Sequence, residues 1–127
     1  MIASGYHTLG GGQALTSGNN DFFAPGFTAS GDGVCVVAGQ VVVDNQGANA
    51  NNSASIQTVR RLNGSATASD GGWNHYVMAD GDSEGSASKT TTFDITEGNS
   101  YELGVRVFVA NDSVGDLAFP TVTYFRL

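Results

Sequence analysis

The feature that most limits what this chain can fold into is a strict alternation of residue types over residues 101–109. An apolar or aromatic residue stands at every second position: Tyr101, Leu103, Val105, Val107 and Val109. Successive side chains of a strand point to opposite faces of a sheet. The period of two therefore predicts a half-buried β-strand.

Two further segments near the end of the chain show the same period. Residues 89–95 place Thr91, Phe93 and Ile95 on one face of a predicted strand. Residues 117–127 form the last predicted strand, in which one face carries Phe119, Thr121, Thr123, Phe125 and Leu127. Pro120 has no backbone N–H to donate, so we expect it at a sheet edge or a bulge.

The rest of the chain is interpreted as strands separated by turns and loops, because no segment has helical periodicity. Segment 34–43 is nearly all apolar, which predicts a central strand covered on both faces for part of its length. Other strands are expected at residues 13–16, 27–30, 53–62 and 73–78. Turns or loops are expected at residues 17–21, 31–33, 44–52, 63–64, 80–88, 97–99 and 111–116. These patterns predict an all-β fold, a two-sheet antiparallel jelly-roll sandwich.

The length of 127 residues suits a single domain, which we expect to span residues 1–127. Residues 1–12 end in three glycines and are interpreted as a flexible N-terminal arm or as a first edge segment. The first residues have no basic segment followed by an apolar stretch, so no signal peptide is expected and synthesis in the cytoplasm is expected. No apolar run approaches the roughly 20 residues of a membrane helix.

Composition argues against several classes of partner. Charged residues make up 13% of the chain and the net charge is -7. Nucleic acids and anionic membranes are bound by clustered Lys and Arg. The positive residues are scattered except for Arg60 and Arg61, so neither partner is expected. Cys35, the only cysteine, lies in an apolar run and is expected to be a buried thiol.

Four features together resemble the tumour-necrosis-factor-like jelly roll of complement-type globular heads. They are the Gly-bounded strand of residues 33–43, the Arg-x-Asn-Gly turn of residues 61–64, the strand and Gly turn of residues 93–98, and the aromatic end at residues 124–127. The resemblance covers residues 22–127 and implies a small jelly roll that assembles as a trimer and acts by contact. Small acidic versions of this kind are similar to tailed-phage capsid decoration (cement) proteins and fibre heads.

Two segments are candidates for specific chemistry. The loop of residues 80–85 carries Asp80, Asp82 and Glu84, and such a loop is interpreted either as a solvated acidic turn or as a calcium site. Residues 73–76 combine Trp73, His75 and Tyr76, which suit a core position, a protein interface or a glycan contact. No HExxH, CxxC, Gly-x-Ser-x-Gly or P-loop pattern occurs. Neither enzymatic activity nor a cofactor or bound metal is expected.

Two functions remain open from the sequence. The first is a virion structural protein, a decoration module on the capsid exterior that binds the major capsid protein or another virion protein as a homotrimer. The second is a receptor- or carbohydrate-binding head of a fibre or surface protein, with a glycan as partner. The residues expected at an interface are Tyr6, His7, Arg60, Arg61, Trp73 and Tyr76.

Overall fold

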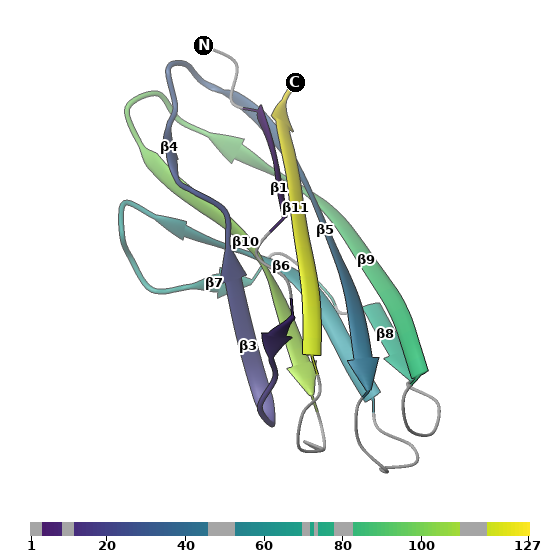
Figure 1. The fold of residues 1–127 in the computed structure, drawn as a ribbon. Coiled ribbons are helices and arrows are strands. Elements are labelled where there is room, and N and C mark those ends of the chain that lie inside the picture. Colours follow the sequence, from purple (N-terminus) through teal and green to yellow (C-terminus); the bar gives the residue numbers. More distant parts are fainter. Residues whose placement is uncertain are drawn as a thin grey trace.

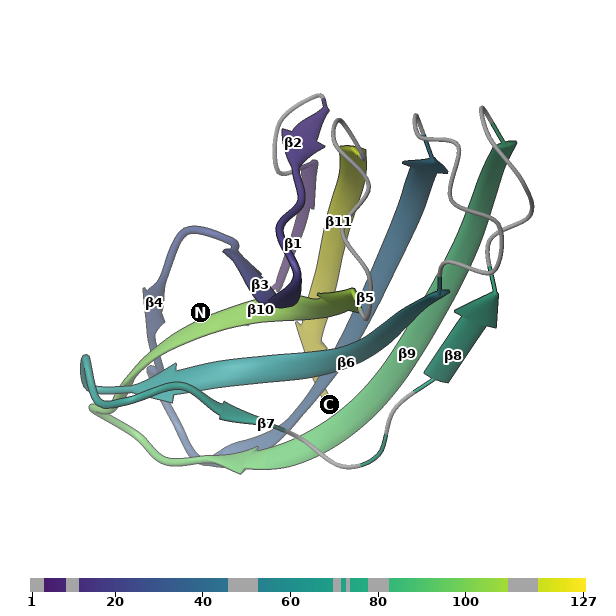
Figure 2. The same ribbon diagram turned by 90° about the horizontal axis from the view of Figure 1, so that it is seen from below.

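The computed structural model describes residues 4–8, 12–45, 53–69, 72, 74–77, 83–109 and 117–127. Two antiparallel sheets face each other (Figures 1 and 2), and the described residues include no helix. The predicted all-β sandwich is therefore confirmed. In the described part of the chain, no helix is long and apolar enough to span a membrane.

The first sheet, sheet A, runs in the order β1, β11, β5, β9, and β2 pairs with β11. Its strands are β1 (Ser4–Thr8), β2 (Gln13–Ala14), β5 (Gly33–Asn45), β9 (Ser83–Ile95) and β11 (Leu117–Arg126). The second sheet, sheet B, runs in the order β3, β10, β6, β7, with β4 paired to β10 and β8 paired to β6. Its strands are β3 (Gly18–Phe23), β4 (Phe27–Thr28), β6 (Ser53–Leu62), β7 (Ala68–Ser69), β8 (Asn74–Val77) and β10 (Ser100–Val109).

The core lies between the two sheets and is built by the alternation seen in the sequence. Every odd residue of β10 is buried, from Tyr101 to Val109, as its period of two predicts. The inward residues of sheet A include Val37, Val122 and Phe93. Burial of each such side chain contributes about 1.5 to 3 kcal/mol. The core therefore accounts for the two-layer architecture without a disulfide.

The sheets approach closely near the middle of β5. A Cβ atom added to Gly39 would lie 3.0 Å from Cγ2 of Val105 in the opposite sheet. Beside this point, the hydroxyls of Thr58 and Thr91 form a hydrogen bond of 2.6 Å that joins β6 to β9. Because this polar pair is satisfied across the gap, it does not weaken the surrounding apolar core.

Two predicted loops are wrong because polar and small residues there form strands. Residues 17–21 were expected to be a turn, but β3 begins at Gly18 and pairs with β10. Residues 80–88 were expected to be a loop, but β9 begins at Ser83 and pairs with β5 along its whole length. In both cases the partner strand supplies the backbone hydrogen bonds and most of the apolar surface.

The two ends of the described chain meet in sheet A. Residues Ser4–Thr8, within the segment interpreted as a flexible arm or a first edge segment, form β1 and pair with residues 121–125 of β11. The β2 pairing with β11 covers only Leu117 and Ala118. Pro120 therefore lies between the two described pairings, opposite Val41 of β5.

Candidate interaction surfaces

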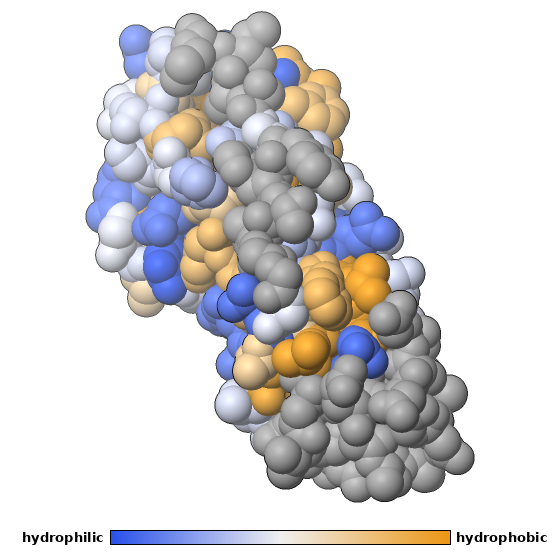
Figure 3. Space-filling view, in the orientation of Figure 1, coloured by the Kyte–Doolittle hydropathy of each residue, from blue (hydrophilic) through white to orange (hydrophobic). Residues whose placement is uncertain are grey.

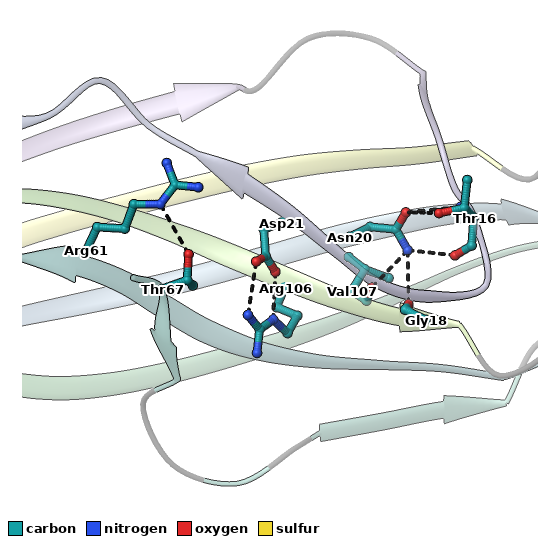
Figure 4. A network of polar contacts seen from close by, with 8 residues as sticks. All are labelled: Thr16, Gly18, Asn20, Asp21, Arg61, Thr67, Arg106 and Val107. Atoms are coloured by element: carbon teal, nitrogen blue, oxygen red, sulfur yellow. Dashed lines mark hydrogen bonds and ion pairs between the residues drawn. The ribbon is translucent and has the colours of Figure 1, made fainter. Parts of the chain in front are cut away.

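Arg60 and Arg61 were predicted to make contacts at an interface, and the structure places them on opposite faces of sheet B. Arg61 points outward, with its guanidinium 3.9 Å from the ring centre of Phe23. Its Nε donates a 3.1 Å hydrogen bond to Oγ1 of Thr67, which is shown in Figure 4. Its NH1 lies 3.8 Å from Oε2 of Glu102. This ion pair is exposed to solvent and therefore contributes little to the stability of the fold. Arg61 therefore holds neighbouring segments of its own chain together.

A second arginine ties two strands of sheet B together at their outer face. The Arg106 guanidinium donates two hydrogen bonds to the Asp21 carboxylate, at 2.6 and 3.0 Å (Figure 4). These hydrogen bonds to Asp21 raise the pKa of Arg106. Nothing in the sequence pattern indicated this contact, because Asp21 follows two asparagines, which favour a turn.

The start of β3 is fixed by the side chain of Asn20. Its Oδ1 accepts a 3.0 Å hydrogen bond from the backbone N–H of Thr16, and its Nδ2 donates to the carbonyl oxygens of Thr16, Gly18 and Val107 (Figure 4). Such a side chain replaces backbone partners at a bend. The segment predicted to be a turn, residues 17–21, thus contains a bend, and this bend leads directly into β3.

A pocket of about 460 Å³ opens where the chain crosses from sheet A to sheet B. We call it the β6–β9 pocket, and its lining residues are Arg60, Leu62, Thr92, Phe93, Asp94, Thr96, Asn99 and Tyr101. The Arg60 guanidinium lies 4.5 Å from the ring centre of Phe93, so the arginine forms part of the wall. The sequence predicted Arg60 as a contact residue, but nothing in it indicated that Arg60 lies beside residues 92–99.

The outer face of sheet A carries exposed aromatic side chains. Phe119 and Phe125 are 36% and 44% exposed, and register places them opposite Val42 and Val36 of β5. In Figure 3, hydrophobic residues gather on this face over the lower halves of β11 and β5. The sequence indicated that Phe119 and Phe125 share a face, and the structure shows that this face points away from the core.

The same face is uncharged over most of its length. Asp44 lies near one end and Asp94 near the other. The described outward residues between them are Val34, Val36, Ala38, Gln40, Val42, Ser86, Ser88, Thr90, Thr92, Phe119, Thr121, Thr123 and Phe125. The apolar residues of β5 on this face are only half-buried. Segment 34–43 is thus central, as predicted, but its second face is only partly covered.

Several predicted site residues lie outside the part of the chain that can be described. Trp73, Asp80 and Asp82 are outside it. Tyr6 and His7 lie in β1, and Tyr76 lies in β8 opposite Ala54, but only their backbone is described. Ser83 and Glu84 belong to β9, so the segment interpreted as an acidic loop ends in a strand. Among the described residues, no group of three His, Cys, Asp or Glu side chains could hold a metal ion.

Cys35 is fully buried on the inward face of β5, as its apolar run predicted. Burial raises the pKa of its thiol to about 11. The thiolate is the nucleophilic form of cysteine. Near neutral pH this side chain therefore acts as a small apolar residue of the core.

The fold is shared with a chain of a solved virus structure. A chain in the structure of infectious bursal disease virus, Gx strain, superposes with a TM-score of 0.53 over 98% of this chain, at 10% sequence identity. That superposition covers 33% of the viral chain, so the present chain spans about a third of its length. At this identity the likeness is one of fold alone. The sequence matches no protein-family model and no curated protein sequence.

Proposed function

We propose that this protein is a non-enzymatic structural module of a virion that adheres to a larger protein lattice through the outer face of sheet A. The observation that carries the proposal is the exposure of Phe119 and Phe125 on a face whose described central residues are uncharged. Exposed apolar patches with polar rims are typical of protein interaction sites. The role needs contact alone and no reacting group.

The size of the face suits a specific interface. Four strands of sheet A lie side by side. With strands roughly 4.8 Å apart and about ten residues of about 3.3 Å each, the face measures on the order of 600 Å². Two such surfaces bury about 1,200 Å², which is the lower end of the range for specific interfaces.

Charge favours the same face as the contact. The whole chain carries a net charge of -7, so most of its surface repels another acidic protein. An uncharged patch avoids both this repulsion and the cost of removing charges from water on contact. We therefore propose that adhesion uses this patch and that the acidic remainder faces solvent.

The setting of this adhesion is proposed from likeness of fold. The fold of a virus chain supports a place in a virion, and the resemblance to the tumour-necrosis-factor-like jelly roll supports a homotrimer. In its most specific form, the proposal is a capsid decoration (cement) module that covers the capsid exterior and binds the major capsid protein.

Two measurements test the proposal. Virus particles that encode the chain are purified on a density gradient, and their proteins are quantified by mass spectrometry. We expect the chain in a fixed ratio to the shell protein, and its absence would overturn the virion role. Size-exclusion chromatography with light scattering gives the mass of the isolated protein. We expect three copies, and a monomer at high concentration would overturn the trimer.

A further inference from the structure

The β6–β9 pocket lies away from the centre of the adhesive face and has the size of a ligand site. Its volume of about 460 Å³ falls within the roughly 300 to 1,000 Å³ of small-molecule pockets. Its walls come from the ends of β6 and β9, from the turn after β9 and from the first residues of β10. It is therefore supported by both sheets rather than by a single loop.

The pocket offers hydrogen-bond acceptors and donors together. No described residue forms a hydrogen bond or ion pair with the Asp94 carboxylate, which is exposed at the rim. The Asn99 Oδ1 accepts a 3.1 Å hydrogen bond from Asn63 Nδ2, and no described residue accepts from the Asn99 Nδ2. A carboxylate that only accepts and an amide that can donate thus line one pocket.

One apolar side chain completes the lining. Leu62 is 41% exposed at the end of β6, whereas the rings of Phe93 and Tyr101 are almost fully buried. The Tyr101 hydroxyl accepts a 2.8 Å hydrogen bond from the backbone N–H of Thr96, which fixes the floor of the pocket. A ligand can therefore place an apolar edge against Leu62 and polar groups against the rim.

This combination selects against a ligand with a single charge. Arg60 and Asp94 carry opposite charges in the same lining, so an anion attracted by the arginine is repelled by the carboxylate. A neutral ligand with several hydroxyls meets no such conflict. Each hydroxyl both donates and accepts, which suits Asp94, Asn99 and the hydroxyls of Thr92 and Thr96.

We propose that the β6–β9 pocket binds one pyranose unit of a glycan. Hydroxyls of the sugar donate to Asp94 and accept from Asn99 and Arg60, and the C–H face of the ring packs on Leu62. The pocket borders the outer face of sheet A and shares Thr92 and Asp94 with it, but its lining includes neither Phe119 nor Phe125, so the proposal does not depend on the virion role.

The test is a nuclear magnetic resonance titration of the ¹⁵N-labelled protein. The probes are glucose, galactose, mannose, N-acetylglucosamine and fucose, each added alone, with glycine and sodium acetate as charged controls. We expect at least one sugar to produce saturable shifts, with millimolar affinity, in the amides of residues 60–62, 92–96 and 99. Asp94→Asn removes the charged acceptor and is expected to weaken this binding about tenfold.

Two control variants make the titration decisive. Glu97→Gln removes a negative charge from the turn beside the pocket without changing the lining and is expected to bind as the wild type does. The double variant Phe119→Thr/Phe125→Thr should also bind sugar normally, whatever its effect on lattice adhesion. The proposal is overturned if no sugar shifts these amides, if Asp94→Asn binds as tightly as the wild type, or if glycine or acetate produces the same shifts.

Discussion

The adhesive role of sheet A predicts a large effect from two substitutions. Phe119→Thr and Phe125→Thr remove the exposed rings while keeping a residue with high strand propensity. A phenylalanine exposes about 200 Å² in full, so side chains that are 36% and 44% exposed offer together about 160 Å². At about 25 cal/mol per Å², burial of this area contributes up to about 4 kcal/mol.

The expected loss is smaller than this upper limit. Threonine keeps a methyl group at each position, and contact with the lattice covers only part of each ring. We therefore expect the double variant to lose about 2 kcal/mol of binding free energy, or about 30-fold in Kd. The assay is co-sedimentation of labelled protein with particles that lack the chain, titrated over protein concentration.

A matched control lies on the opposite sheet. Phe108 is 38% exposed on the outer face of sheet B, so Phe108→Thr removes a similar area from the wrong side. We expect this variant to bind within about twofold of wild type. All three rings are more than half buried against their own sheets, so each substitution should lower the free energy of unfolding by about 1 to 2 kcal/mol, and binding is compared under conditions in which every variant stays folded. Full binding by the double variant, or an equal loss from Phe108→Thr, would refute adhesion through sheet A.

Three further outcomes are expected for stability. Gly104→Ala should cost about 3 kcal/mol in urea unfolding, because the added methyl group overlaps the Phe22 carbonyl oxygen, whereas Gly72→Ala, with open space around it, should change little. Asp21→Asn should lower the free energy of unfolding by about 1 kcal/mol, because the substitution weakens the two hydrogen bonds with Arg106. High salt screens this ion pair, so the difference between variant and wild type should be smaller there. The raised pKa of Cys35 shows that the folded state favours the neutral thiol. The free energy of unfolding should therefore be at its full value below about pH 9 and fall by up to about 2 to 3 kcal/mol towards pH 11. Unfolding measured at each pH should show a smaller decrease for Cys35→Ala.

The sequence predicted the strands whose alternation is produced by the core. Tyr101 to Val109 alternate because one face of β10 lies against sheet A, and this constraint is local enough to be visible along the chain. β3 could not be predicted in the same way. Its polar residues Asn20 and Asp21 are stabilised by contacts with Val107 and Arg106, which lie far away in the sequence.

The candidate surfaces depend even more on long-range placement. Arg60 and Asp94 line one pocket only because β6 and β9, which belong to different sheets, end near the same point. The shared face of Phe119 and Phe125 was visible in the sequence, but a period of two does not tell which of two faces is covered. That assignment needs the opposite sheet, which buries Val122 and Tyr124 instead.

The position of β11 has a consequence for the order in which the chain can fold. β11 lies between β1 and β5, and its register joins Ser4 to Phe125, two residues more than a hundred positions apart. Until residues 117–126 have been synthesised, β1 lacks the strand with which it pairs, and β5 lacks one of its two neighbours in sheet A. Closing so long a segment is slow, since its entropy is lost before the new contacts form. A ribosome-bound chain that stops short of β11 should therefore remain sensitive to proteases over its first strands and become resistant only when this central strand is added.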